Sequence, residues 1–508
     1  DIGGKNMDSM TKRRVVLWPY LLILLLASFA LCLAAPFSWT DKMPLSDSTI
    51  FLYIGKSMNS GLTLYQSLFD HKGPLLFLIN AVGLRIGGEF GVWLLGVASI
   101  FISFWFSFKT CLLFAKRIPS LLAVLSLIPA LINCFEGGNY SEEYALPFIS
   151  ISLFIFTKYF LDSAAIKKAE IVITGFCLGA VFLLRANMIA LWICFCISIF
   201  LQLCFKKEGK RLLSFVLLFL SGFLLCLLPF TVYFLFKGCL SDAIYQSLTF
   251  NFLYSGEKGA RLLSMAKWVY SFLADNYLLL VLLAYLGILF FGKSDSNRPV
   301  LLHLTNGAFI FLTLVLVCIS RRMYLHYFLV FIPCAVIPSC YVFQGLWQLL
   351  SQINRKNAAI YSTIFLGVLL CSLHFRTAYN YVSTCRQMHR ASQDDEYKVI
   401  SRLIQENSQE GDTIYTHRLN GVLYLTSSRE SATKCFSLPA ADLNYFPKIE
   451  TEFIDDLEKN QPIFIAVRKD ALNLHATTDQ KMLAIIDSSY HLYYSTDNID
   501  LYQLTPQV

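Results

Sequence analysis

One hydrophilic stretch near the start of the chain carries two side chains suited to acid–base and anion-binding chemistry. Asp47 stands near the head of segment 46–61, and Lys72 stands just before Gly73-Pro74. A positioned carboxylate can take the proton of an attacking hydroxyl, and a cation can stabilise charge that develops on a leaving group. Each residue also has a structural interpretation, Asp47 as a helix N-cap and Lys72 as an interfacial anchor.

Other charged residues stand in short joints between apolar runs. Glu142 and Glu143 follow a Gly-Gly pair, and either could be a second carboxylate that orients Asp47 or the acceptor, although a helix N-terminus also favours acids there. Basic side chains in two further joints indicate an anionic ligand. These candidate phosphate-binding residues are Arg185, Arg321 and Arg322. Candidate supporting residues are His71, Lys56, His326 and Tyr327.

The cysteines and histidines show no metal-binding pattern. Most of the fifteen cysteines lie in or beside apolar runs, where cysteine behaves as a small apolar residue. No two have the C-x-x-C spacing of a zinc site, and His71 has no partner at a suitable spacing. We therefore assign no metal ligands and no certain cofactor, and a divalent metal stays open. Cys385 and Cys435 lie in the hydrophilic C-terminal region and could form a disulfide.

The composition indicates a polytopic membrane protein that must hold these residues in place. Of the 508 residues, 56% are hydrophobic and only 15% are charged, whereas soluble domains carry roughly 25% charged residues. A spanning helix needs about 20 apolar residues. Eleven runs are predicted to span the membrane: Val15–Ala35, 91–114, 119–135, 144–161, 170–185, 187–205, 212–236, 277–292, 300–320, 327–348 and 358–375.

Basic residues recur at every second joint between these runs, which predicts that those joints are cytoplasmic. The N-terminus is then cytoplasmic, and the odd number of spans places residues 376–508 on the extracytoplasmic side of the plasma (inner) membrane. The net charge of +8 is attributed to these anchors and not to nucleic-acid binding. The joints are Lys12/Arg13/Arg14, Lys116/Arg117, Lys167/Lys168, Lys206/Lys207/Lys210/Arg211, Lys293/Arg298 and Arg355/Lys356.

No acid stands near the centre of a predicted span, so the chemistry is expected in the extracytoplasmic loops. In loop one, residues 36–90, the segments 46–61 and 75–84 predict two helices too polar or too short to span the bilayer. We predict a mainly α fold: a transmembrane helical bundle over 1–375 and a small extracytoplasmic α/β domain over 376–508.

Periodicity in the C-terminal region predicts the elements of that α/β domain. Helices are expected near 397–404, 453–459 and 479–486. Strands are expected over 413–416, 422–426, 462–467, 490–495 and 501–504.

The spacing from Asp47 through Met58 and Gly61 to Lys72 resembles the first periplasmic loop of the GT-C superfamily of glycosyltransferases. The likeness is greatest to the group of lipid A aminoarabinose transferase and the protein O-mannosyltransferases. It covers loop one closely, the layout of spans broadly, and the C-terminal region only in position. The family's loop-one Asp matches Asp47. Its Lys before Pro, which meets the lipid phosphate, matches Lys72, although Gly73 intervenes.

The chain departs from the family pattern at three positions. Many members have an acid directly after the first Asp, where this chain has Ser48. The aminoarabinose enzyme has an Arg three residues after the Asp, where this chain has Ile50. The acid before the Lys is replaced by His71. These departures leave the exact substrate and the metal requirement open.

The resemblance implies a membrane glycosyltransferase, hexosyl or pentosyl, that moves a sugar from a polyprenyl-phosphate donor with inversion. Its partners would be that donor, a glycan, lipid or protein acceptor, and the membrane. Two alternatives stay open. One is a non-enzymatic lipid or polysaccharide exporter, and the other is an inactive assembly subunit, suggested by Ser48.

Overall fold

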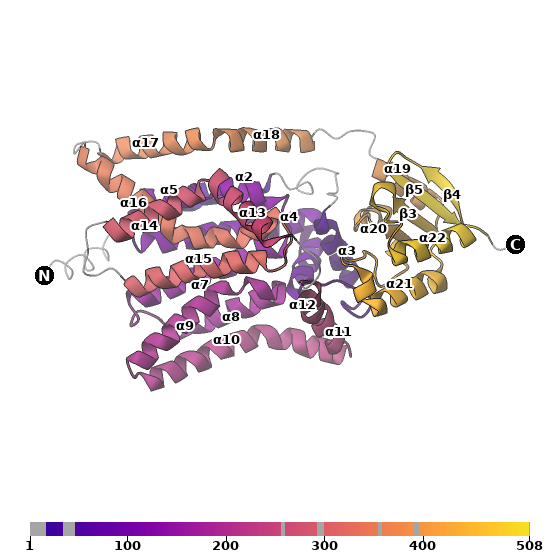
Figure 1. Cartoon of the computed structure of the whole chain (residues 1–508), viewed down its shortest axis with the longest axis horizontal. Coiled ribbons are helices and arrows are strands. Elements are labelled where there is room, and N and C mark those ends of the chain that lie inside the picture. Colours follow the sequence, from indigo (N-terminus) through magenta and orange to yellow (C-terminus); the bar gives the residue numbers. More distant parts are fainter. Residues whose placement is uncertain are drawn as a thin grey trace.

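The structure is a computed structural model that describes residues 17–33, 46–255, 260–291, 299–353, 358–389 and 396–506. A bundle of long helices occupies most of the chain, and a smaller domain with a sheet lies at one end of the bundle (Figure 1). The short helices α3 (Asp47–Asn59), α11 (Leu240–Ile244) and α12 (Phe250–Ser255) lie at that same end, between the two parts.

The bundle is made of apolar helices, which makes the chain a multi-pass membrane protein. Six described helical segments are long and apolar enough to cross a membrane, and the pair α13 (Leu262–Asp275) and α14 (Leu278–Phe291), bent by 79°, would make a seventh. The six segments are Pro74–Cys111, Arg117–Phe135, Ser141–Leu161, Gly209–Phe236, Val300–Cys318 and Leu325–Gln352.

This number is lower than the eleven predicted spans, although a helix is present at every predicted position. The difference comes from four predicted spans that form helices of only 15 to 17 residues. These are α2 (Trp18–Cys32), α8 (Lys168–Leu184), α9 (Ala190–Phe205) and α17 (Ala358–Leu373).

Loop one contains both predicted helices: α3, and the first part of α4 (Pro74–Leu112), which starts one residue before the predicted segment and ends at the non-helical Gly87 and Gly88. The second part of α4 forms the next predicted span. Gly88 has a positive φ of 61°, and a Cβ on Gly91 would stand 2.1 Å from the Gly83 carbonyl oxygen. The glycines therefore let the chain fold back on itself at a sharp kink.

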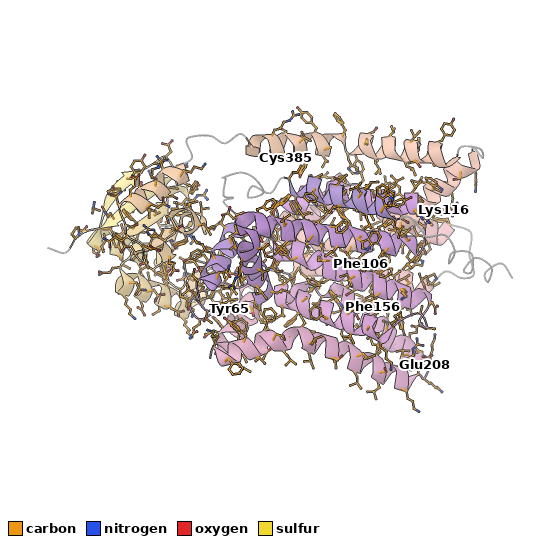
Figure 2. The ribbon with its side chains drawn as sticks, turned by 180° about the vertical axis from the view of Figure 1, so that it is seen from behind. Tyr65, Phe106, Lys116, Phe156, Glu208 and Cys385 are labelled. Atoms are coloured by element: carbon orange, nitrogen blue, oxygen red, sulfur yellow. The ribbon has the colours of Figure 1, made fainter. Side chains whose placement is uncertain are left out.

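The described basic joints lie at the far end of the bundle from the C-terminal domain. Figure 2 shows Lys116 and Glu208, from two of these joints, at that far end, and Tyr65 of loop one near the domain. The charge pattern predicts this separation of the basic joints from loop one and the C-terminal domain. It stays a prediction that the end with the basic joints faces the cytoplasm. The joints at residues 12–14, 293–298 and 355–356 lie outside the described residues.

The C-terminal domain contains a five-stranded sheet in the order β2-β1-β3-β5-β4. Strand β1 pairs in parallel with β2 and β3, and β5 pairs antiparallel with β3 and β4. Its strands are β1 (Thr413–His417), β2 (Glu430–Ser431), β3 (Phe464–Arg468), β4 (Tyr490–Ser495) and β5 (Ile499–Leu504). Its longer helices are α19 (Glu396–Glu406), α21 (Pro447–Asn460) and α22 (Thr477–Ser489).

One prediction for the C-terminal region is wrong, and the disulfide left open there is not formed. The segment predicted as a strand over 422–426 is helix α20 (Val422–Ser427), because it packs its buried face against α3 and α19 and has no strand partner. Cys385 and Cys435 are both free thiols. Cys435 is buried in the core of the domain, while Cys385 lies on α18 (Phe375–His389), which follows α17 along the side of the bundle (Figures 1 and 2).

Candidate active site

A cavity of about 840 Å³, here named the main cavity, lies where loop one, several helix ends and the C-terminal domain meet. Its charged and histidine lining comes from segments that are far apart in the sequence. These residues are Asp47, Asp70, His71, Lys72, Glu136, Arg185, His326 and Arg418. Carboxylates and cations therefore share one cavity at the end of the bundle that carries the C-terminal domain.

Asp47 is the first residue of α3, and Ser46 before it takes the N-cap position. Ser46 is in extended conformation, and its carbonyl accepts a hydrogen bond from Thr49 Oγ1 at 3.0 Å. Asp47 is therefore not the N-cap. Its carboxylate lines the main cavity and makes no hydrogen bond or ion pair with another described residue.

A buried polar network holds α3 against its neighbours. Asn139 donates through Nδ2 to Ser48 Oγ at 2.9 Å and exchanges amide hydrogen bonds with Asn80 of α4 at 2.9 and 3.1 Å. Tyr144 donates its hydroxyl to Asn139 Oδ1 at 3.0 Å. All four side chains are at most 3% exposed. Water cannot reach their polar groups, so these hydrogen bonds satisfy them instead. Ser48, which departs from the family's acid, has this structural role.

The cation at Lys72 is placed by the short loop before α4. Its backbone N–H donates to Asp70 Oδ1 at 2.8 Å, and its Nζ stands 2.9 Å from His71 Nε2. Burial, followed by the charges of Lys72 and Arg185, holds the pKa of His71 well below its ordinary value. His71 is therefore neutral and accepts from the ammonium, so the positive charge of Lys72 is not cancelled by its neighbour.

Asp70 is a second carboxylate in the main cavity. Burial raises its pKa to about 6, against the opposing effect of Lys72, and the nearby charge of Asp47 raises it further. Two carboxylates that repel each other and one ammonium thus occupy the same wall.

Gly73 explains why a residue intervenes between Lys72 and Pro74. Its N–H donates to the Leu184 carbonyl at 3.1 Å, and a Cβ there would stand 2.0 Å from the Leu183 carbonyl oxygen. Only glycine allows this approach to the end of α8. The contact brings Lys72 beside Arg185, which follows α8 directly.

Arg185 is held by a carboxylate and a tyrosine. Its Nη1 donates to Glu142 Oε1, and its Nη2 donates to the Tyr327 hydroxyl at 2.9 Å. The guanidinium also lies over the Tyr327 ring, 4.3 Å from its centre. Glu142 is 2% exposed, and its carboxylate forms an ion pair with Arg185. It therefore orients Arg185 and does not itself line the main cavity.

Three rings are stacked along one wall of the main cavity. The His326 ring is parallel to Tyr140 at 4.2 Å and nearly parallel to Tyr324 at 5.6 Å. Its Nδ1 lies 2.6 Å from Glu136 Oε2. Glu136 has a left-handed φ of 47°, as the Gly137-Gly138 pair after it also does at 87° and 80°. These glycines therefore let loop two turn so that Glu136 reaches His326.

A second cavity of about 260 Å³, the apolar cavity, adjoins the main cavity. The two share His71, Arg185, Ser247, Leu248 and Asn251. The rest of its lining is mostly apolar and comes from α8, α10 (Gly209–Phe236) and α11: Phe182, Leu183, Leu227, Phe230, Phe234, Leu240 and Ile244 among others. Ser247 and Leu248 lie in η3, a π-helical turn (Tyr245–Thr249), a feature frequent at functional sites.

The structure brings together six of the eleven residues predicted for the site. Asp47, His71, Lys72, Arg185, His326 and Tyr327 line the main cavity, and Glu142 reaches it through Arg185. Four others lie elsewhere. Glu143 is buried and accepts from Asn139 N at 2.6 Å, Lys56 reaches Ser428 in the C-terminal domain, and neither Arg321 nor Arg322 lines the cavity.

Sequence reasoning missed several residues of the site. Asp70 stands only two positions before Lys72, and this proximity was an available signal. Glu136 was visible as an acid in loop two, directly before Gly-Gly. Arg418 and Asn251 carried no signal, because only the folded chain brings them to the main cavity.

The fold is similar to solved structures that have the GT-C fold, which is the fold that the resemblance in loop one implies. ArnT from Cupriavidus metallidurans in the apo state is similar over 96% of this chain and 99% of that chain, at 13% identity and a TM-score of 0.62. ArnT bound to undecaprenyl phosphate is similar over 97% and 100%, at 11% identity and a TM-score of 0.64. The archaeal oligosaccharyltransferase AglB from Archaeoglobus fulgidus, in complex with an inhibitory peptide and a dolichol-phosphate, is similar over 96% and 74%, at 11% identity and a TM-score of 0.55.

The chain belongs to the family described as putative competence-induced protein Ccs4, N-terminal domain, whose model matches residues 7–356. No curated protein matches the chain.

Replacing Asp70 by Asn is expected to stabilise the protein at neutral pH. The raised pKa means that the folded state binds a proton more tightly than the unfolded state, so stability falls as pH rises from the ordinary value of 3.8 through about 6. A shift of this size corresponds to about 3 kcal/mol. Asn keeps an oxygen that accepts from Lys72 N. Thermal unfolding of purified Asp70→Asn should therefore occur at a higher temperature than wild type at pH 7.5, and the gap should shrink toward pH 4.5. Asp455→Asn, at an exposed position, is the control, and a lower unfolding temperature for Asp70→Asn at pH 7.5 would contradict the burial argument.

Gly73→Ala is expected to lower the unfolding temperature, because the added methyl overlaps the Leu183 carbonyl. Overpacking of this kind typically costs about 1–3 kcal/mol. Gly287→Ala in α14 is the matched control, since a Cβ there meets nothing within 4 Å. Equal stability of the two variants would show that the approach to α8 is not tight.

Proposed function

We propose that the chain is a glycosyltransferase that moves a sugar from a polyprenyl-phosphate donor to an acceptor hydroxyl at the extracytoplasmic face of the plasma membrane. The observation that carries this proposal is the meeting of Asp47, Lys72 and Arg185 in one cavity that adjoins an apolar cavity. A ligand with an anionic head and an apolar chain fits this pair of cavities. Undecaprenyl phosphate, found in the similar ArnT complex, is such a ligand.

The phosphate of the donor would lie at the junction of the two cavities. Lys72 supplies a positive charge there, and Arg185 supplies a guanidinium that Glu142 and Tyr327 hold in place. The first units of the polyprenyl chain would enter the apolar cavity among the side chains of α8, α10 and α11. The sugar would then point into the main cavity, where Asp47 lies.

In the transfer step the acceptor oxygen forms a bond to the anomeric carbon while the bond between that carbon and the phosphate oxygen breaks. Asp47 takes the proton of the acceptor hydroxyl. The bonding electrons leave with the phosphate, whose added negative charge Lys72 and Arg185 stabilise. A single displacement of this kind inverts the anomeric configuration.

The alternative of an exporter is less well supported. The polar residues of the main cavity come from loops and helix ends at the end of the bundle that carries the C-terminal domain, and an exporter needs a polar route along the length of the bundle. The alternative of an inactive assembly subunit drew on Ser48, which instead has a structural role through Asn139.

The direct test is incubation of the purified chain with a panel of polyprenyl-phosphate sugars and a membrane extract as the source of acceptor. Release of free polyprenyl phosphate that depends on the extract is the expected result. Lack of release from every donor in the panel would oppose the proposal.

Asp47→Asn is expected to reduce transfer by about 10²–10⁴-fold, since the amide cannot take a proton. Its unfolding temperature should stay near that of wild type, because Ser46 and not Asp47 occupies the N-cap. The readout is the rate of polyprenyl phosphate release, with Asp455→Asn as the control. Unchanged release by Asp47→Asn would remove this residue from the role of base.

Lys72→Ala is expected to weaken binding of undecaprenyl phosphate by about 10–100-fold, the effect of losing a charged hydrogen bond of about 1.5–3 kcal/mol. Binding is measured by ligand-dependent thermal stabilisation of the detergent-solubilised protein. Lys56→Ala is the matched control, because Lys56 lies on α3 but does not line the main cavity. Equal binding by the two variants would exclude Lys72 as the phosphate contact.

A further inference from the structure

The C-terminal domain supplies part of the wall of the main cavity. Arg418 and Asn420, from the loop between β1 and α20, line it together with the segment 437–440 and Ala471. Arg418 is the charged residue of this wall, and its side chain is 29% exposed. The cavity therefore has a cation that comes from a different domain than Lys72 and Arg185.

The loop that carries Arg418 has an unusual backbone. Arg418 and Asn420 both have left-handed conformations, with φ of 60° and 51°. A left-handed conformation is disfavoured at a residue with a side chain, because its Cβ comes too close to the following carbonyl oxygen. Such a cost persists only where the surrounding structure holds the residue, and it is frequent at ligand-binding positions.

Contacts with loop one fix this loop relative to Asp47. Gly421 N–H donates to Thr49 Oγ1 at 3.2 Å, and a Cβ on Gly421 would stand 2.1 Å from the Thr49 carbonyl oxygen. Tyr53, one turn further along α3, stacks on Tyr424 of α20 at 4.7 Å, and its hydroxyl accepts from Ser431 N at 2.8 Å. The loop is thus seated on the first turn of the helix that begins with Asp47.

A buried network inside the C-terminal domain positions the Arg418 side chain. Asp479 is fully buried, and its Oδ1 lies 3.4 Å from His417 Nε2 and 3.7 Å from Arg418 Nη2. The Asp479 Oδ2 accepts from Asn473 N at 2.9 Å, and the Tyr415 hydroxyl lies 3.2 Å from His417 Nδ1. Asp479 Oδ1 makes no hydrogen bond to a described residue, so it attracts Arg418 by charge alone, at the distance of a loose ion pair.

Pairing with Asp479 leaves part of the guanidinium without an acceptor. Among the described residues, Arg418 Nε has no hydrogen-bond partner, but this atom is itself buried, so the donors left for a ligand are the terminal nitrogens. The shortest contact between Arg418 and Asp479, from Nη2 to Oδ1, is 3.7 Å, which is longer than a hydrogen bond. The remaining donors suit a planar oxyanion, which a guanidinium binds through two parallel hydrogen bonds.

Arg418 is also separate from the site proposed for the donor phosphate. The residues that the two cavities share come from loop one, the end of α8 and the segment 247–251, whereas Arg418 comes from the C-terminal domain and, like Lys72, lines the main cavity alone. A ligand anchored in the apolar cavity by its chain would place its phosphate at Lys72 and Arg185. An anion at Arg418 then belongs to the other substrate.

We propose that Arg418 binds an anionic group of the acceptor, a phosphate or a carboxylate, so that the C-terminal domain selects acidic acceptors. This inference rests on the proposed function only in naming the second ligand an acceptor. The anion-binding property itself can be measured without any sugar transfer.

The test uses the full chain in detergent, saturated with undecaprenyl phosphate so that the donor site is filled. Inorganic phosphate, and acetate as a carboxylate probe, are titrated at constant ionic strength with chloride as the reference. The unfolding temperature is the readout. Wild type should be stabilised by at least one of the two probes beyond the effect of chloride, and Arg418→Gln should lower the affinity for that probe by about tenfold or more. Arg402→Gln, on the exposed face of α19, is the matched control and should bind as wild type does.

A second measurement needs no variant. Phenylglyoxal labels arginine side chains, and peptide mass spectrometry locates the labelled positions. The probe that stabilises wild type should protect Arg418 in the undecaprenyl-phosphate-saturated protein and leave Arg402 labelled. The proposal is overturned if Arg418→Gln binds both probes as wild type does, if neither probe stabilises wild type, or if undecaprenyl phosphate alone abolishes their effect. The last result would assign Arg418 to the donor phosphate, whatever the outcome of the transfer assay.

Discussion

The reciprocal amide pair of Asn80 and Asn139 is the contact on which the site depends most. It is completely enclosed by α3, α4 and α7 (Ser141–Leu161), and it extends to Ser48 at the start of α3. A buried amide that loses its partner costs about 1–3 kcal/mol, so each of these groups holds the others in place. Through this pair, the carboxylate of Asp47, the turn of loop two and the first half of α4 have one fixed arrangement. Close packing adds to it, since a Cβ on Gly55 of α3 would stand 2.8 Å from the Ala81 nitrogen of α4.

Charges around the main cavity are arranged so that some are cancelled and others are not. Arg185 and Glu142 form a buried pair, and Glu136 lies against His326, whereas the Lys72 side chain contacts the neutral His71 and its backbone N–H donates to Asp70. Asp70 has the opposite character, because it is a carboxylate whose burial makes ionisation unfavourable. The folded protein is therefore less stable with Asp70 ionised than with Asp70 protonated. Such a loss of stability is common at sites that are organised to bind a ligand. A bound anion or a departing phosphate at Lys72 would interact with these charges strongly, because the distances are short and the local dielectric constant is low.

Much of the bundle follows from local sequence, while the site depends on contacts across the chain. The apolar runs, the N-terminal start of α3 after Ser46 and the start of α4 at Pro74 were predictable, because hydrophobic periodicity and capping act within a few residues. The kink at Gly87 and Gly88 was not, because whether two glycines end a helix depends on what packs against them. The segment 422–426 reads as a strand by its composition, and its contacts with α3 and α19 make it a helix. Of the candidate residues, Asp47, Lys72 and Arg185 could be chosen by chemistry alone. Arg418 could not, because a tertiary contact 372 residues apart in sequence, between Gly421 and Thr49, brings its loop to the cavity.

The seating of the C-terminal domain on loop one has a consequence for where this protein can be divided. Phe69 of loop one and Phe250 of α12 form an aromatic cluster with Phe446 of the domain, and Tyr53 is covered by Tyr424 and Phe436. The region that defines the family, residues 7–356, ends before any of the covering rings. Cut there, the membrane part would present these aromatic side chains to water as a contiguous apolar patch, the kind of surface that drives association. The part of the chain that the family model matches is therefore smaller than the part whose contacts cover the aromatic side chains of loop one.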